Sequence, residues 1–300
     1  KGMGSSGYLQ LIKGLLLVLI LCPFYTWGAT VGLLVDKKSD QALSFQKHLK
    51  KHSPDHNILI VTPEQLSEKV KVDVWFTIGP KVLGRLLADV EYKQPVLSLF
   101  IGTGSADKLR TLHPQRHFSV LDNTPTLDRQ LALIKVLNPH AKQVSVFHSA
   151  QGKRQLKGLN KLAQSLNLKL LTSELSDPLN WKRDALKTLK DSDLVLAVKD
   201  SAIYNATNIR SILMRLYRAG RPLIGPDKGY VRAGAVASTY SGMPETLKIC
   251  TDLLKDIGQW PKVIHNPYFN VSINAQVARS LNIVVQDSEQ VAKAVRELLP

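Results

Sequence analysis

Apolar and polar residues follow two different spacings along most of this chain. From residue 30 onward, short continuous apolar runs are separated by longer stretches in which apolar side chains recur every three or four positions. A continuous run is typical of a strand buried on both faces of a parallel sheet, and the three-to-four spacing is typical of an amphipathic helix. The runs predict strands at residues 30–35, 57–61, 74–78, 95–100, 118–121, 143–148, 169–171, 194–198, 222–224 and 235–239. These are too many for one small doubly wound sheet, so we expect an α/β fold of two Rossmann-like lobes with parallel sheets.

The helical stretches between these runs carry start and stop signals of their own. Thr124 is suited to an N-cap with Pro125 in the first helical position, and the apolar stripe that follows stops before Pro139. A second stripe runs through residues 205–217 and ends at Gly220. Both stretches are predicted to be helices of the second lobe.

Three short extended segments would carry the chain between the lobes. We place them near residues 121–124, 234–239 and 261–265. The predicted lobe 1 then consists of residues 29–121 and 236–262, and the predicted lobe 2 of residues 122–235 and 263–300. Three such connections form a hinge, because short extended segments can absorb the closure of one lobe on the other.

The first residues have the pattern of a secretory signal peptide. Lys13 precedes an apolar run from Leu15 to Cys22, and the small residues Gly28 and Ala29 follow. We predict a cleaved signal peptide at residues 1–28, export to the periplasm and a mature chain that begins near Ala29. The rival interpretation is an uncleaved N-terminal anchor, for which this run is short, since a span needs about 20 apolar residues.

Composition fits an ordinary globular protein with a basic surface. The chain is 44% hydrophobic and 21% charged, and its formal net charge is +16. Lysine and arginine are spread over many segments, as on solvated helix faces, so we expect no nucleic-acid partner. The two cysteines are Cys22, inside the predicted signal, and Cys250, so the mature chain has no disulfide.

Three segments resemble a known family. Residues 119–147, with Arg129-Gln130 in a helix that ends at a proline, are similar to the segment that enters the second lobe of ABC transporter substrate-binding proteins of the type I periplasmic-binding fold. Residues 194–241 and 271–283 resemble later parts of the same lobe. The resemblance implies capture of a small solute between two lobes, often with delivery to a membrane permease. Residues before 120 match only loosely.

Candidate ligand-binding residues follow from the fold class. In open parallel sheets, ligands bind beyond the carboxyl ends of the strands. The residues that follow predicted strands in this way, together with Tyr240 on a crossing segment, are Asp36, Gly79, Pro80, Gly102, Thr103, Ser149, Asp200, Tyr204, Asp227, Tyr230 and Tyr240.

Each candidate has a ligand role and a structural alternative. Gly79-Pro80 would open a helix whose free N–H groups could hold a carboxylate or phosphate, and Thr103 would donate a hydroxyl from a flexible loop. Asp200 would pair with a ligand amino group, beside the ring of Tyr204. The alternatives are a tight turn at Gly79, a helix cap at Asp200, and packing between the lobes for the tyrosines.

The sequence lacks the common signatures of catalysis. It has no Cys-x-x-Cys pair, no His-Glu-x-x-His metal motif, no Gly-x-Ser-x-Gly elbow and no phosphate-binding Gly-x-x-x-x-Gly-Lys-Ser/Thr loop. Gly102-Thr103-Gly104 lacks the third glycine of a dinucleotide fingerprint and is not expected to open a long helix. We therefore expect no enzyme activity, no metal and no cofactor.

The leading hypothesis is an exported, monomeric solute-binding protein that closes on a small metabolite, such as an amino acid or a similar polar or aromatic solute, for an ABC-type permease. The second hypothesis is an accessory or sensor protein that presents a ligand-dependent surface to a membrane partner. The third is an enzyme built on two Rossmann-like halves, which no motif supports.

Overall fold

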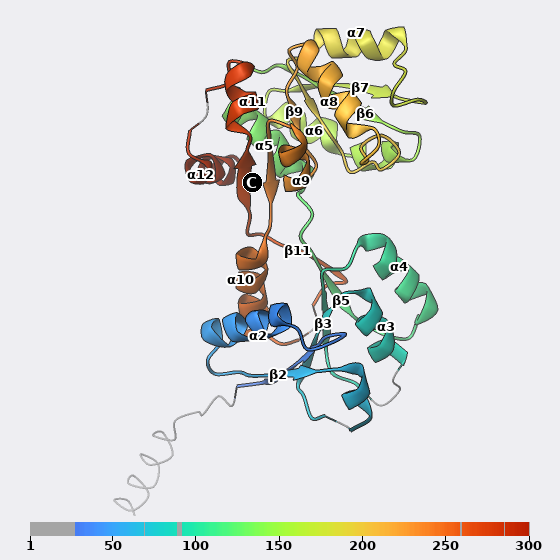
Figure 1. The fold of residues 1–300 in the computed structure, drawn as a ribbon, viewed down its shortest axis with the longest axis vertical. Helices are drawn as coiled ribbons and strands as arrows, with labels where there is room; N and C mark the ends of the chain where they lie inside the picture. The colour runs from blue at the N-terminus through green and yellow to red at the C-terminus, as the bar shows by residue number, and fades with distance from the viewer. Residues whose placement is uncertain (1–27, 69, 89–91, 259, 285, 300) are drawn as a thin grey trace, which may run out of the picture.

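The computed structural model describes residues 28–68, 70–88, 92–258, 260–284 and 286–299. They form two lobes, one above the other in Figure 1, and the chain passes between the lobes through a narrow central region. Apart from Gly28, the predicted signal peptide lies outside the described residues. Within the described part of the chain, no helix has both the length and the apolar character needed to cross a bilayer.

Lobe 1 is built around a six-stranded sheet in the order β11-β5-β4-β3-β1-β2, and its neighbouring strands are parallel. The strands are β1 (Thr30–Leu34), β2 (Asn57–Val61), β3 (Val74–Ile78), β4 (Val96–Leu99), β5 (Ser119–Asp122) and β11 (Val263–His265). The central strands β1, β3 and β4 are almost wholly buried, because helices cover both faces of the sheet. This double burial is the physical reason for their continuous apolar runs.

Four helices cover the two faces of this sheet. They are α2 (Asp40–His52), α3 (Pro80–Ala88), α4 (Thr103–Leu112) and α10 (Met243–Leu254), and a short 3₁₀ helix, η1 (Pro63–Glu68), follows β2. Helices α2 and α10 lie together on one face, where Phe45 and Leu247 enter a shared core. Helices α3 and α4 cover the other face, where Leu83 and Ala106 are buried.

Lobe 2 repeats this plan with one difference. Its six strands follow the order β12-β10-β9-β8-β6-β7, and only the outer pair β10–β12 is antiparallel. The strands are β6 (Gln143–His148), β7 (Lys169–Glu174), β8 (Leu194–Leu196), β9 (Leu223–Ile224), β10 (Ala237–Tyr240) and β12 (Asn270–Ile273).

The helices of lobe 2 again form two cores, one on each side of the sheet. They are α5 (Leu127–Leu137), α6 (Leu159–Ser165), α7 (Arg183–Asp191), α8 (Ile209–Arg218), α9 (Lys228–Ala233), α11 (Ala275–Ser280) and α12 (Ser288–Leu298), with the 3₁₀ helix η2 (Gly152–Leu156). Helices α5, α6 and α12 contribute Leu131, Leu159 and Val291 to the larger core. Helices α7 and α8 contribute Leu189 and Leu216 to the smaller one.

The chain crosses between the lobes three times, but two crossings differ from the expected boundaries. Strand β10 pairs within the second sheet, so the second crossing follows Tyr240 instead of preceding residue 236. Strand β11 pairs with β5 of the first sheet, so the third crossing follows His265 instead of residue 262. Membership of a sheet is decided by hydrogen-bonding partners distant in sequence, which an apolar pattern does not specify.

Two helix starts also differ from expectation. Helix α5 has Thr126, not Thr124, at its N-cap, and the Thr124 backbone N–H donates to the Asp122 carboxylate at 2.9 Å in the segment before the helix. The expected flexible loop at residues 102–105 is instead the first turn of the ten-residue helix α4, with Gly102 at the N-cap. The apolar pattern predicted neither β11 nor β12, because both are short and only partly buried. Only the family resemblance over residues 271–283 implied a strand at β12.

Candidate functional site

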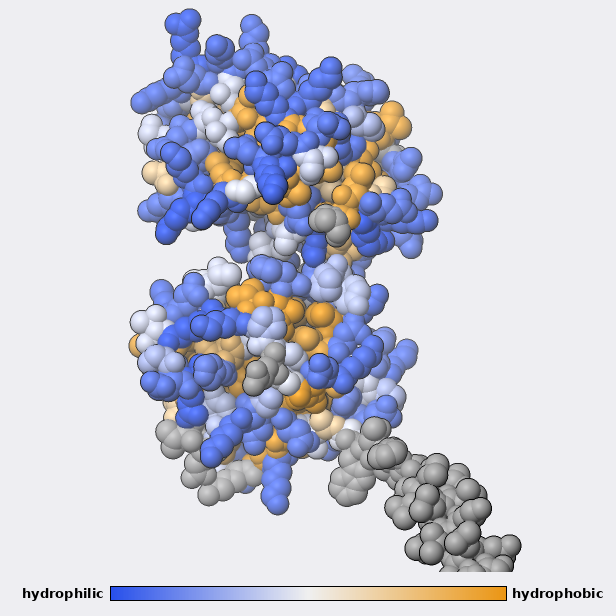
Figure 2. All heavy atoms as spheres, turned by 180° about the vertical axis from the view of Figure 1, so that it is seen from behind, coloured by the Kyte–Doolittle hydropathy of each residue, from blue (hydrophilic) through white to orange (hydrophobic). Residues whose placement is uncertain are grey.

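The carboxyl ends of the two parallel sheets face each other across the cleft between the lobes. A pocket of about 140 Å³ lies there, beside the crossings. Thr103 of lobe 1 lines it together with Asp122 and Thr124 of the first crossing, and with Gln155 and Lys199 of lobe 2. Of the predicted ligand-binding residues, only Thr103 lines this pocket. In Figure 2 the waist between the lobes is narrow and both lobes are mainly hydrophilic on the side shown.

On lobe 1, Asp36 and the Gly79-Pro80 turn lie next to each other at the ends of β1 and β3. The Asp36 carboxylate forms an ion pair of 2.8 Å with Lys81 in the first turn of α3. Gly79 adopts a φ of +90°, a left-handed conformation that favours glycine, and the space where a Cβ would stand is open. Pro80 begins α3, as predicted. The Asp36 carboxylate therefore already has a cationic partner, although both side chains are more than half exposed and the pair is weak.

The next loop of lobe 1 contains a strained residue that the sequence interpretation missed. Phe100, directly after β4, has a φ of +55° although it is a bulky residue for which this region is costly. Its ring is 46% exposed and meets the ring of Phe45 edge to face, with centroids 6.4 Å apart. Phe100 therefore presents an aromatic surface at the end of the sheet where the cleft opens.

On lobe 2, Asp200 joins the loops that follow β8 and β6. Its carboxylate accepts hydrogen bonds from the backbone N–H groups of Ser149 at 2.7 Å and Ala202 at 3.1 Å, and the residue is only 6% exposed. The hydroxyl oxygen of Ser149 accepts a bond from the N–H of Gly152 at 3.1 Å. The Asp200 carboxylate thus holds a turn and not the helix cap that was its structural alternative, because α8 begins only at Ile209 with Asn208 at its N-cap. Contact with a ligand amino group stays a prediction.

The Tyr204 and Tyr230 side chains pack in or against the smaller core of lobe 2. Tyr204 is 3% exposed, its hydroxyl has no hydrogen-bond partner, and burial raises its pKa well above the ordinary value. The hydroxyl of Tyr230 donates to the Tyr204 carbonyl oxygen at 2.7 Å, and burial raises the pKa of Tyr230 as well. Asp227 caps α9 by accepting from the Gly229 N–H at 2.7 Å. The ring of Tyr204 packs in the core instead of facing the cleft.

Tyr240 remains accessible at the second crossing. It is half-buried, and the Lys228 ammonium lies 4.3 Å from its ring centroid in a cation–π arrangement. Its position at the end of β10 leaves the ring beside the segment that leads into lobe 1.

Side-chain hydrogen bonds tie the three crossings to one another. Asn266, buried in the third crossing, donates to Asn123 of the first at 2.9 Å, and Asn123 donates to Thr246 of α10 at 2.8 Å. The buried Arg129 donates to the Asn266 carbonyl oxygen at 2.6 Å, and desolvation lowers the pKa of this guanidinium. These bonds fix the connections where a hinge would bend.

Two other lining residues of the pocket were missed by sequence reasoning. The Lys199 ammonium, exposed at the mouth of the cleft, is 3.4 Å from the Thr124 hydroxyl, and Gln155 donates to the Lys199 carbonyl oxygen at 2.8 Å. Lys199 directly follows the strand predicted at residues 194–198, so the same rule that selected Asp200 could have found it. Nothing in the local sequence marks Gln155, which reaches the cleft only because η2 folds back over the β6 end.

The described residues contain no cluster of three or more His, Cys, Asp or Glu side chains suited to a metal ion. Helix α2 does carry a His-x-x-x-His spacing, at His48 and His52, that the motif argument overlooked. The Nδ1 atoms of these two rings are 2.7 and 2.8 Å from the carbonyl oxygens four residues earlier. Cys250 is fully buried, and this burial raises the pKa of its thiol.

Comparison with known proteins identifies the family of this chain. A model of the ABC transporter substrate-binding protein family matches residues 113–295. The chain belongs to this family. No curated protein is detectably similar to this substrate-binding protein in sequence.

The chain is also similar to solved structures over most of their length. The ligand-free, open structure of a substrate-binding protein with adhesive properties from Clostridium difficile has a TM-score of 0.63 and 15% identity, over 87% of this chain and 97% of that chain. A conserved domain protein from Vibrio cholerae has a TM-score of 0.48 and 18% identity, over 88% and 98% of the two chains. The likeness to the Clostridium difficile protein and the family match show that this substrate-binding protein has the type I periplasmic-binding fold.

Proposed function

We propose that this protein captures one small solute between its lobes after export to the periplasm and delivers it to an ABC-type permease. The observation that carries the proposal is that both sheets point their carboxyl ends into one cleft beside three hydrogen-bonded crossings. Such a cleft offers loop side chains and helix N-termini from both sides to a ligand that closure would enclose. The family match supports the same role.

The chemistry of the cleft favours a polar solute with an anionic group and an aromatic or apolar part. The N-termini of α3 and α4 open toward the cleft from lobe 1, and the exposed ammonium of Lys199 lies opposite. The half-exposed Phe100 ring supplies an apolar surface beside them. An amino acid or a similar carboxylate combines these features, and we propose that class. The geometry requires no covalent step, so we propose binding without turnover.

A ligand screen tests the proposal directly. The mature chain, from Ala29 onward, is heated with amino acids, nucleosides, sugars, vitamins and small anions in turn. A ligand at about 100 times its dissociation constant should raise the free energy of unfolding by about 2.7 kcal/mol, and small-angle X-ray scattering should show a smaller radius of gyration.

A pair of matched variants tests whether the ligand binds in the cleft. Lys199→Gln should weaken binding of the ligand found in the screen, whereas Lys108→Gln, an exposed lysine on the outer surface of α4, should leave it unchanged. A screen with neither a thermal shift nor compaction would overturn solute capture. Binding with compaction, but with no permease recovered by crosslinking and no uptake defect on deletion, would favour the accessory or sensor role.

A further inference from the structure

A hydrogen bond connects a helix of lobe 1 directly to a strand of lobe 2. The side-chain amide of Asn270, the first residue of β12, donates to the Glu245 carboxylate of α10, with 2.7 Å between Nδ2 and Oε1. Both residues are partly buried. The bonds described above at the crossings each end on a crossing segment, whereas this one, here called the interlobe bond, depends on the positions of both lobes at once.

Neither partner of the interlobe bond can follow the other if the lobes rotate. The second oxygen of Glu245 accepts from the backbone N–H of Gly242 at 2.8 Å, which fixes the carboxylate in the first turn of α10. The helix dipole also favours a negative charge there. Asn270 is paired with Tyr240 in the antiparallel β10–β12 ladder, so its short side chain stays with the second sheet. The interlobe bond therefore forms only over a narrow range of angles between the lobes.

The interlobe bond spans two places where the chain changes lobes. In the second crossing, residues 241 and 242 join β10 to α10. In the third crossing, Tyr268 is bound to lobe 1 because its hydroxyl donates to Asp252 of α10. The next residue, Phe269, is buried in the larger core of lobe 2. Closure must bend the chain at these two places, and the two partners of the interlobe bond lie just beyond them.

The arrangement of the helices shows how closure changes the bond. Helix α10 lies on one side of the crossings in Figure 1, and α4 lies on the other side. The cleft pocket is on the α4 side, because Thr103 of α4 and Gln155 of η2 line it. A rotation that brings α4 and η2 together moves α10 away from lobe 2. Closure of the cleft therefore lengthens the interlobe bond.

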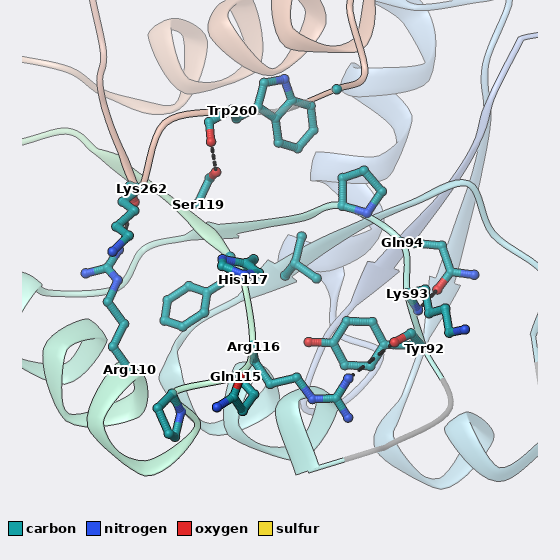
Figure 3. A pocket seen from close by; sticks show the side chains of 15 residues that line it. Tyr92, Lys93, Gln94, Arg110, Gln115, Arg116, His117, Ser119, Trp260 and Lys262 are labelled. Carbon is teal, nitrogen blue, oxygen red and sulfur yellow. Dashed lines mark hydrogen bonds between the residues drawn. The ribbon is translucent and has the colours of Figure 1, made fainter.

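The start of the third crossing is fixed and does not absorb this rotation. The segment before β11 is anchored in lobe 1 at a basic pocket of about 820 Å³, at the amino ends of β4, β5 and β11 (Figure 3). There Ser119 donates to the Trp260 carbonyl oxygen at 3.3 Å, and Arg110 donates to the Lys262 carbonyl oxygen at 2.8 Å. Since β11 is also paired with β5, bending is confined to the residues after His265.

We infer that the interlobe bond holds the cleft in its open arrangement, so that Glu245 and Asn270 set the affinity for a solute although neither lines the cleft pocket. The inference rests on the proposed function, because solute capture is what requires closure. The apparent dissociation constant equals the intrinsic constant divided by the fraction of closed protein. A hydrogen bond to a charged group shifts such an equilibrium by about 10-fold or more. Loss of the bond should therefore raise the closed fraction, and tighten binding, by about this factor.

The distance between the lobes, measured without ligand, tests this inference. Double electron–electron resonance is recorded between spin labels at Lys108→Cys of α4 and Lys153→Cys of η2, which are exposed positions on different lobes. The full chain carries Cys22→Ser, and Cys250 is fully buried and should not react with the label.

Two variants change the interlobe bond, and one matched variant does not. Asn270→Val removes the amide donor, and Asn270→Asp places a second carboxylate beside Glu245, which adds repulsion. The control is Ser272→Val, on the same strand and the same face as Asn270, where Ser272 pairs with Ser238 inside the second sheet. Thermal unfolding checks that each variant folds.

The population with a short distance should rise about 10-fold in Asn270→Val and further in Asn270→Asp, while Ser272→Val should match wild type. Lower stability without a change in the distance distribution would show a merely structural bond and overturn the inference. An equal shift in Ser272→Val would overturn it as well. Because no ligand is present, a ligand screen without a hit leaves this measurement valid, so the inference and solute capture can fail separately.

Discussion

At the scale of single residues, the loop side chains at the sheet ends are occupied by their neighbours. Both carboxylate oxygens of Asp200 accept hydrogen bonds from backbone N–H groups, Asp36 pairs with Lys81, and Asp227 caps a helix. These bonds hold the loops in fixed positions. A buried carboxylate without hydrogen-bond partners would destabilise the folded state, because its lost hydration would not be replaced. The side chains left to contact a ligand are therefore those that do not hold a loop in place, chiefly those of Lys199, Phe100 and Thr103.

The contact between Gly152 and Asp200 gives a residue-scale prediction. A Cβ at residue 152 would overlap the Asp200 Oδ2 atom, so Gly152→Ala must displace the carboxylate from the Ser149 N–H. We expect a loss of about 1–3 kcal/mol in the free energy of unfolding, measured by urea denaturation. Gly104→Ala is the control, because nothing lies near its Cβ position in the first turn of α4. Equal stability of the two variants would contradict the packing argument.

At the scale of elements, the hinge depends on contacts between helices and crossing segments. Gln130, buried in α5, donates to the Gly225 carbonyl oxygen and the Ser238 hydroxyl and accepts from the Thr239 N–H, so one side chain joins α5 to β10 and to the residue that follows β9. Helix α10 is joined to the third crossing through the Tyr268 hydroxyl, which donates to Asp252 at 2.5 Å. These bonds orient the crossings relative to the lobes without restraining the cleft itself.

The Asp252 contact predicts a pH dependence. Hydrogen bonds from Lys255 and then from Tyr268 hold the pKa of Asp252 below its ordinary value of 3.8. A lowered folded-state pKa contributes stability that is present above the unfolded value and is lost as the pH falls through the folded value. Asp252→Asn should therefore cost less than about 1 kcal/mol at pH 7, since the pair is partly exposed, and the cost should shrink as the pH falls below the ordinary pKa of 3.8 towards 2.

Urea denaturation at both pH values checks this expectation. Asp256→Asn, a neighbouring exposed carboxylate, is the matched control and should change stability less at pH 7. A cost for Asp252→Asn that persists unchanged at pH 2 would show that packing, not charge, is responsible.

At the scale of the whole molecule, the two lobes have separate cores. Residues of lobe 1 fill two buried hydrophobic clusters, and residues of lobe 2 fill two others. No such cluster of the described residues extends across both lobes, so little buried apolar surface couples the lobes when no ligand joins them. The same openness leaves the cleft accessible to a solute.

This separation predicts how the protein unfolds. Without ligand, scanning calorimetry should give a calorimetric enthalpy larger than the van't Hoff enthalpy, because the lobes unfold partly independently. A ligand that contacts both lobes should bring the two enthalpies together. Equal enthalpies for the free protein would instead show that the three crossings alone couple the lobes into one cooperative unit.

The sequence by itself determined the fold class and most of the elements. Buried parallel strands such as β3 and β6 are continuous apolar runs, and amphipathic helices such as α8 show their spacing directly, because both patterns arise from local burial. The family resemblance over the second lobe was visible for the same reason, and the family match over residues 113–295 confirms it.

Only the tertiary structure decided which residues meet. β10 and β11 were assigned to their sheets by strands far away in sequence, and the first turn of α4 formed where a loop was expected. The polar partners of Asp200 and the basic pocket before β4, β5 and β11 assemble from segments that no local pattern connects. Burial within one helix or strand determines the spacing of its apolar residues, so the sequence shows it. Contacts between distant segments depend on the order of the strands in the whole sheet, which no local spacing shows.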